Sequence, residues 1–121
     1  NEDTKYHMYL AEFDNHCGVN AWVPNSKVVH ARSTKGYNSK YIAIDTVHQH
    51  FAHEPDAIRG PNGEYVLYYI AGNVTSGKEC ECRDGSTPNN CNPGNVPQPF
   101  TVLMQYSSSV NGPWSEPVEV I

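Results

Sequence analysis

The stretch HEPDAIRGPNGEYVLYYIAG, residues 53–72, decides the fold class of this 121-residue chain. Its second half, EYVLYYIAG, is rich in tyrosine, valine and isoleucine, which favour β-strands. The GPNG at 60–63 carries two glycines that suit the positive φ of a hairpin turn, and the HEPDAIRG before it supplies a partner strand. The stretch therefore predicts a β-hairpin.

Similar segments recur on both sides of this hairpin. KYHMYLAEF (5–13) matches EYVLYYIAG (64–72), with tyrosine, an apolar residue and tyrosine at corresponding positions. VVHARSTKGYNSKYIAID (28–45) matches VLMQYSSSVNGPWSEPVEVI (102–121), and each of these segments has a central glycine turn followed by a final strand, at 40–46 or 116–121. The order of strands therefore repeats along the chain.

This repeat predicts an all-β chain built from antiparallel four-stranded propeller blades, an incomplete β-propeller. Residues 1–50 form a partial first blade whose opening strand is missing, and residues 51–121 form a second blade with a Cys-rich insertion at 73–99. A small β-sandwich of the same seven strands is the alternative. Because a propeller closes with about four to eight blades, the remaining blades, from the same protein or from partner chains, are expected partners.

Composition and charge exclude several classes of partner. The chain has 13 Asp and Glu against 8 Lys and Arg, a formal net charge of −5, and its basic residues are scattered singly. Such a surface repels a phosphate backbone, which argues against nucleic acid. No apolar run approaches the roughly 20 residues of a membrane-spanning helix, so no membrane span is predicted.

Four cysteines predict a secreted, extracellular protein with two disulfides. Cys80, Cys82 and Cys91 lie in one polar loop, and Cys17 lies far upstream. Cys80 and Cys82 are too close in sequence to pair with each other, so one is expected to join Cys91 and the other Cys17, in either arrangement. Asn73 begins an N-glycosylation sequon, Asn-Val-Thr, although such tripeptides also arise by chance.

Histidines cluster in HQHFAHEPDAIR, residues 48–59, and allow a metal site as one interpretation. His48 and His50 would share one face of a strand, with His53 or Glu54 as a third ligand. No matching distal ligand is evident, and hydrogen-bonded loop histidines are the other interpretation. No cofactor and no metal ligands are therefore predicted, with a metal ion kept as an alternative.

Three segments resemble a known family. AHEPDAIRGPNGEYVLYY, SKVVHARS and SVNGPWSEP are similar to blade motifs of the five-bladed β-propellers of glycoside hydrolase family 43 and its relatives. The resemblance extends over almost all of the chain except 73–99. It implies a five-bladed propeller in which the inner strands of three blades each direct one carboxylate to the axis, among them a general acid and a general base.

The resemblance assigns candidate roles to the residues that open the second blade. Glu54 stands at the carboxylate position of the motif, where the general base is normally Asp, and is the candidate catalytic residue. The alternatives are a glutamate of the general-acid type before proline, or a rim glutamate without a catalytic role. His53 flanks Glu54. Asp56 is a second, weaker candidate, which strand alternation would point the same way as Glu54. Only one of three expected carboxylates can be located, so this chain alone is not expected to be a competent glycosidase.

Two further residues are candidates for carbohydrate binding. Trp22 lies in a loop that could border the axial pocket, where its ring would stack on a sugar, although packing is the common role of such a residue. Arg59 would cap its strand or pair with a carboxylate. The sequence thus predicts part of an extracellular glycosidase-like propeller that binds or hydrolyses a polysaccharide. The alternative is a non-catalytic structural or carbohydrate-binding module of an extracellular glycoprotein assembly.

Overall fold

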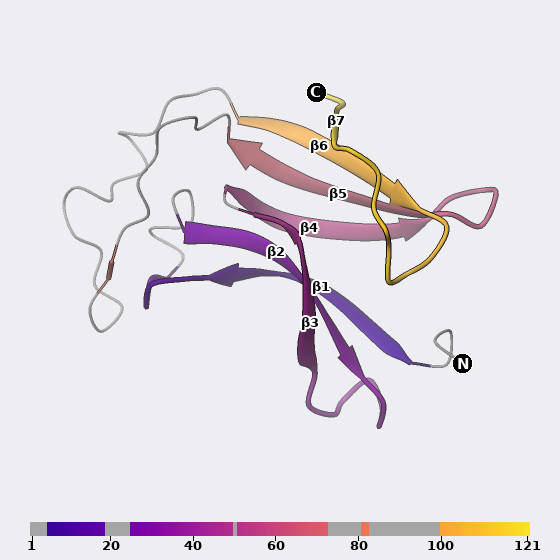
Figure 1. Ribbon diagram of the computed structural model, residues 1–121, viewed down its shortest axis with the longest axis horizontal. Helices are drawn as coiled ribbons and strands as arrows, with labels where there is room; N and C mark the ends of the chain where they lie inside the picture. The colour runs from indigo at the N-terminus through magenta and orange to yellow at the C-terminus, as the bar shows by residue number, and fades with distance from the viewer. Residues whose placement is uncertain (1–4, 19–24, 50, 73–80, 83–99) are drawn as a thin grey trace.

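The computed structural model describes residues 5–18, 25–49, 51–72, 81–82 and 100–121, and these residues form two antiparallel β-sheets (Figure 1). Sheet A has the strand order β1-β2-β3, and sheet B the order β4-β5-β6-β7. The bounds are β1 (Tyr6–Phe13), β2 (Ser26–Ser33), β3 (Ile42–His48), β4 (Ala52–Arg59), β5 (Tyr65–Gly72), β6 (Phe100–Ser107) and β7 (Val118–Glu119). Neither sheet closes on itself within the described residues, and the predicted all-β class is confirmed.

The predicted hairpin at 53–72 joins β4 to β5 in sheet B. Gly63 has a φ of 87°, in the region that only glycine adopts without strain. Its N–H donates to the carbonyl of Gly60 at 3.0 Å, and the N–H of Gly60 donates to Glu64 at 2.8 Å. The turn chemistry of GPNG therefore closes this hairpin, as the sequence predicts.

The repeat in the sequence corresponds to two strand pairs that are built alike. Tyr6 in β1 lies opposite Ser33 in β2, and Tyr65 in β5 lies opposite Ser107 in β6. The last strand of sheet B differs from the prediction, because β7 has only two residues where 116–121 was expected. Pro117 precedes it and has no N–H to offer to a strand ladder, which accounts for the late start of β7.

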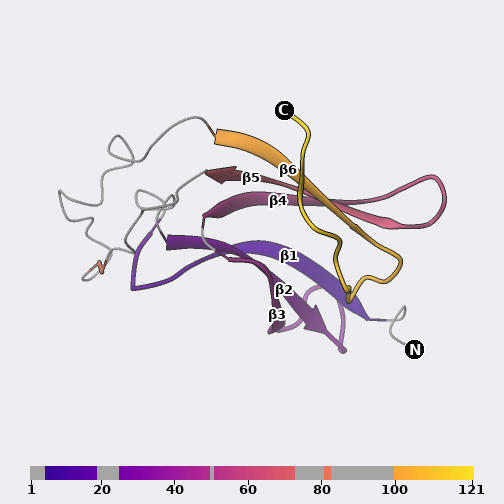
Figure 2. The same cartoon turned by 45° about the horizontal axis from the view of Figure 1, so that its top comes forward.

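The core lies between the sheets. Leu67, Tyr69 and Ala71 alternate along β5 toward sheet A, and they pack with Val28 of β2 and Ala52 of β4. Figure 2 shows the sheets one above the other, with β4 lying against β1 and β2. Each large apolar side chain buried in this way contributes about 1.5–3 kcal/mol relative to its exposed state.

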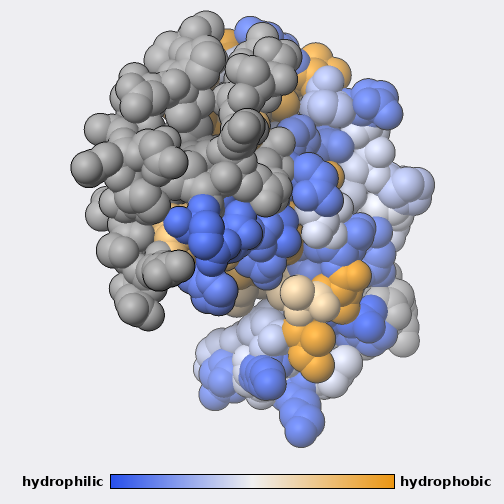
Figure 3. Space-filling view, turned by 60° about the vertical axis from the view of Figure 1, so that its left-hand side comes forward, coloured by the Kyte–Doolittle hydropathy of each residue, from blue (hydrophilic) through white to orange (hydrophobic). Residues whose placement is uncertain are grey.

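The opposite side of sheet B is apolar but half exposed. Ile58 and Tyr106 both lie opposite Val66, on the side of the sheet away from Leu67, and they are 47% and 53% exposed. Val118, on the same side, is 48% exposed. The face of the molecule drawn in Figure 3 is mainly hydrophilic where it is coloured, with small apolar groups.

A disulfide joins Cys17, in the loop after β1, to Cys82, beyond the end of β5. Between the two open pairings, the structure therefore assigns Cys82 as the partner of Cys17. Cys80, Cys91 and the sequon at Asn73 lie outside the described residues. A disulfide fits an extracellular protein.

Across the described part of the chain, no helix is long and apolar enough to cross a membrane.

We predict that Leu67→Ala lowers the free energy of unfolding by about 2–5 kcal/mol, because Leu67 is fully buried and its loss leaves a cavity between the sheets. The matched control is Ile42→Ala, at a side chain that is 65% exposed, which should change stability by no more than about 0.5 kcal/mol. Urea unfolding measures both variants. Equal losses in the two would contradict the position of the core.

Candidate functional site: the cleft between the sheets

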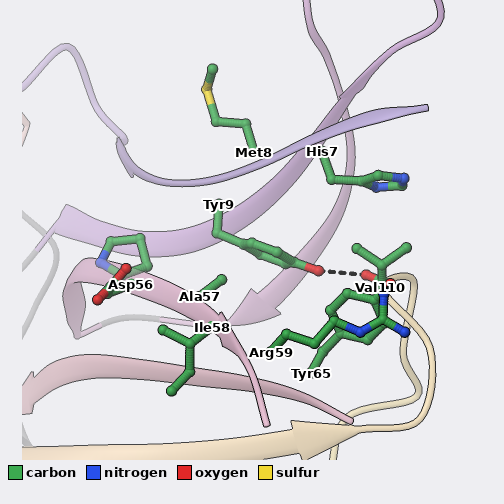
Figure 4. A pocket seen from close by; sticks show the side chains of 10 residues that line it. His7, Met8, Tyr9, Asp56, Ala57, Ile58, Arg59, Tyr65 and Val110 are labelled. Carbon is green, nitrogen blue, oxygen red and sulfur yellow. Dashed lines mark hydrogen bonds between the residues drawn. The ribbon is translucent and has the colours of Figure 1, made fainter. Parts of the chain in front are cut away.

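A hollow of about 480 Å³ opens where the edge of sheet A meets the edge of sheet B. Its walls come from β1 and β4, with one residue each from β5 and from the loop after β6 (Figure 4). We call it the cleft, and its lining residues are His7, Met8, Tyr9, Pro55, Asp56, Ala57, Ile58, Arg59, Tyr65 and Val110. Its volume lies within the range of about 300–1,000 Å³ that is usual for small-molecule sites.

Tyr9 forms the wall between the two sheets. Its hydroxyl donates to the carbonyl of Val110, so that a side chain of β1 is tied to the loop that follows β6. Its ring meets Trp114 edge to face at 5.6 Å and stacks on His30 at 4.7 Å. Burial, with the nearby Tyr65 as a second cause, raises the pKa of Tyr9, so the hydroxyl keeps its proton at neutral pH.

A β-bulge shapes the start of β4. His53 lies opposite Ile70 and Asp56 lies opposite Tyr68, so β4 advances three residues where β5 advances two. Glu54, inside the bulge, has a φ of 50°. This is a strained conformation for a residue with a Cβ, and the proline that follows Glu54 restricts its backbone further.

The bulge corrects one prediction about the candidate residues. Strand alternation had placed Asp56 on the same side as Glu54. Because residues directly opposite each other in an antiparallel pair share a face, Asp56 instead shares a side with His53, the side of Tyr68 and Ile70. Both side chains are exposed, but Asp56 borders the cleft, whereas Glu54 is not among the lining residues.

His53, on the edge strand of sheet B, contacts Ser26 of β2. The Ser26 hydroxyl donates to the carbonyl of Ala52 at 2.6 Å, so its one hydrogen is used. Nδ1 of His53, 3.0 Å from Ser26 Oγ, must then be the donor, and the neutral ring carries its lone pair on Nε2. Burial lowers the pKa of His53, while the adjacent Glu54 raises it less. His53 is therefore a neutral imidazole next to the bulge.

Arg59 is positioned by the hairpin turn. Its Nε–H donates to the carbonyl of Gly63 at 3.2 Å, and Nη1 donates to the hydroxyl of Tyr65, also at 3.2 Å. The guanidinium carbon lies 4.8 Å from the centre of the Tyr65 ring, a cation–π contact. Of the two predicted roles, Arg59 takes that of capping the end of its strand.

Sequence reasoning missed the histidine pair behind the cleft. Nδ1 of His7, which lines the cleft, is 2.8 Å from Nε2 of His30, and the two rings stack at 5.0 Å. His30 is only 1% exposed, and burial, with the charge of His7 as a second cause, lowers its pKa to about 4. Alternation along β1 could have indicated that His7 and Tyr9 share a face. Only the register of β1 with β2 brings His30 next to both of them.

Of the remaining predicted residues that the structure describes, His48 does not line the cleft. Trp22 and His50 lie outside the described residues. The Nδ1–H of His48 donates to the carbonyl of Gln49 at 2.7 Å, and its ring lies 4.9 Å from that of Tyr69. Within the ranges that the structure describes, no group of three or more His, Cys, Asp or Glu side chains is arranged to hold a metal ion.

Comparison with known proteins gave no significant match to this chain, whether against family models, curated proteins or solved structures.

We predict that acid destabilises the fold partly through His30. Its pKa is near 6.5 in an unfolded chain and about 4 in the fold, so the unfolded state binds more protons between these values. The contribution of His30 to the free energy of unfolding is complete above pH 6.5 and is lost as the pH falls toward 4. Urea unfolding from pH 7 to 4.5 should therefore show a shallower loss of stability in His30→Gln than in the wild type.

His16→Gln, at an exposed histidine, controls for the loss of one imidazole. Parallel pH profiles for the wild type and His30→Gln would show that His30 does not contribute to the acid sensitivity.

Proposed function

We propose that this chain is part of an extracellular, glycosidase-like β-propeller and that it binds a glycan in the cleft. The observation that carries this proposal is the composition of the cleft: the strand edges of two sheets bring aromatic rings, a guanidinium and a carboxylate to the border of one hollow. Sugars combine apolar ring faces with many hydroxyl donors and acceptors. A site for them therefore needs aromatic surface together with fixed polar groups.

The side chains of the cleft supply both kinds of contact. The rings of Tyr9 and Tyr65 offer apolar surface. Each ring is fixed by its hydroxyl, which donates a hydrogen bond in Tyr9 and accepts one in Tyr65. Arg59 offers N–H donors, and Asp56 offers carboxylate acceptors. Because Tyr9 and Arg59 are held in place before any ligand arrives, little side-chain entropy is lost on binding.

The arrangement of the two sheets supports the propeller part of the proposal. Strands β1-β2-β3 correspond in order to β5-β6-β7, and within the described residues β1 has no neighbour equivalent to β4. This agrees with a partial blade at 1–50 and a complete blade at 51–121. The half-exposed Tyr106 and Val118 give sheet B an apolar outer side away from the cleft, which suits the packing of a further blade.

Hydrolysis is the second candidate function, and the backbone of Glu54 favours it. Because Glu54 does not line the cleft, a hydrolysed glycan would have to extend beyond the cleft to the bulge. Non-glycine residues held at positive φ cost about 1–3 kcal/mol and gather at functional sites, where the surrounding structure maintains them. Glu54 also stands at the carboxylate position of the motif that resembles family 43. The alternative is a structural or carbohydrate-binding module without turnover, in which the bulge only shapes the edge of sheet B.

We predict that Ala57→Trp abolishes glycan binding, because the indole would fill the cleft from an exposed position on β4. Ala43→Trp adds the same group at an exposed position on β3, away from the cleft, and should bind as the wild type does. Calorimetric titration with arabinan, xylan and galactan oligosaccharides measures both variants. Unchanged binding in Ala57→Trp would place the glycan elsewhere.

We predict that, if the protein hydrolyses one of these polysaccharides, Glu54→Gln reduces the release of reducing sugar by at least about 100-fold, the usual contribution of an acid or base group. Glu119→Gln, at an exposed position on β7, is the control and should retain full activity. Equal activity in wild type and Glu54→Gln would remove Glu54 from the mechanism. Glycan binding without any release of sugar by the wild type would support the non-catalytic module.

A further inference from the structure

We propose that the ligand of the cleft is an acidic glycan and that Arg59 binds the carboxylate of a uronic acid residue. This inference rests on the proposed glycan binding and specifies the class of sugar. It is based on the hydrogen bonding of Arg59, on its position relative to Asp56, and on the absence of a counter-ion among the residues that the structure describes.

Arg59 is a preorganised cation with donors to spare. A guanidinium has five N–H donors, and two of them are used, on Gly63 and on the Tyr65 hydroxyl, which leaves three. The same two bonds and the contact with the Tyr65 ring fix the plane of the group. An arginine held in one plane loses less freedom when it forms the paired hydrogen bonds that a carboxylate accepts.

No carboxylate within the described ranges neutralises this cation. The ion pairs seen between two described residues lie elsewhere, between Lys27 and the carboxylates of Glu12 and Asp14, and between His16 and Glu81. Of the residues that line the cleft, Arg59 has the one permanent positive charge and Asp56 the one carboxylate. The charge of Arg59 is therefore available to an anionic ligand.

Asp56 is placed where it does not compete for Arg59. Arg59 lies opposite Tyr65, on the side of sheet B that faces sheet A, whereas Asp56 lies opposite Tyr68, on the other side. The two residues are three positions apart, about 10 Å along an extended strand. Figure 4 shows Arg59 beside Tyr65 and Val110, with Asp56 at the opposite end of the cleft. The end of the cleft at Arg59 can thus bind a carboxylate without competition from Asp56.

The test compares two ligands that differ only in charge. Trigalacturonate and its fully methyl-esterified form have the same sugar rings, but the ester has no carboxylate. The wild type should bind the acid at least about tenfold more tightly than the ester at low salt, as expected for a charge-assisted, two-point hydrogen bond at an exposed site. The preference should shrink at 0.5 M salt, because the group is exposed and its charge is screened.

Variants of Arg59 assign this preference to one side chain. Arg59→Gln should bind acid and ester equally, and Arg59→Lys should keep part of the preference, because it keeps the charge but loses the planar fork. Lys40→Gln removes a positive charge away from the cleft, at an exposed position, and should keep the full preference. Far-ultraviolet circular dichroism checks that each variant remains folded.

The outcomes separate this inference from the proposed function. Equal binding of acid and ester by the wild type overturns the uronate inference and leaves glycan binding in place. A preference for the acid that persists in Arg59→Gln overturns the role of Arg59. Failure of the wild type to bind either trisaccharide or any neutral oligosaccharide overturns both proposals together.

Discussion

Side-chain packing between two separate sheets is the constraint on which the rest of this structure depends. Within the described residues no strand of sheet A pairs with a strand of sheet B, so backbone hydrogen bonding does not fix their relative position. That position is set by Leu67 and Tyr69 of β5, which pack on Val28 of β2 and on Ala52. Because the cleft lies where the two sheet edges meet, its width and shape follow from this packing.

A few polar contacts refine the position that the packing sets. The Tyr9 hydroxyl reaches across to Val110, and the Ser26 hydroxyl reaches the carbonyl of Ala52. Hydrogen bonds are directional, and in a partly buried setting a broken one costs about 1–3 kcal/mol. The two contacts therefore resist sliding of one sheet over the other. Apolar packing is not directional and resists such sliding less well.

Local features of the fold could be predicted from the sequence, because their causes are local. The hairpin at 53–72 follows from Gly63 and from the β-forming residues of β5, and the repeat indicated a second strand pair of the same kind. The late start of β7, at Val118 rather than at residue 116, follows from Pro117, whose effect on a strand is also local. The choice of Cys82 rather than Cys80 as the partner of Cys17 depends on the folded structure and could not be read from the spacing of the cysteines.

The cleft could not be predicted, because it depends on register and on packing between sheets. Alternation failed at Asp56, since the bulge adds one residue that a regular strand does not have. Pro55 was the available signal, because the residue before a proline is restricted and the regular ladder is interrupted there. The burial of His30 and its pairing with His7 likewise depend on which residues lie opposite each other in β1 and β2.

The bridge between Cys17 and Cys82 encloses all of β2, β3, β4 and β5 in one covalent ring. A peptide bond cut anywhere inside this ring opens it but does not release a fragment, so the severed halves stay tethered and can return to their places without a bimolecular search. A single cut within the ring would thus leave a molecule that can regain its folded form.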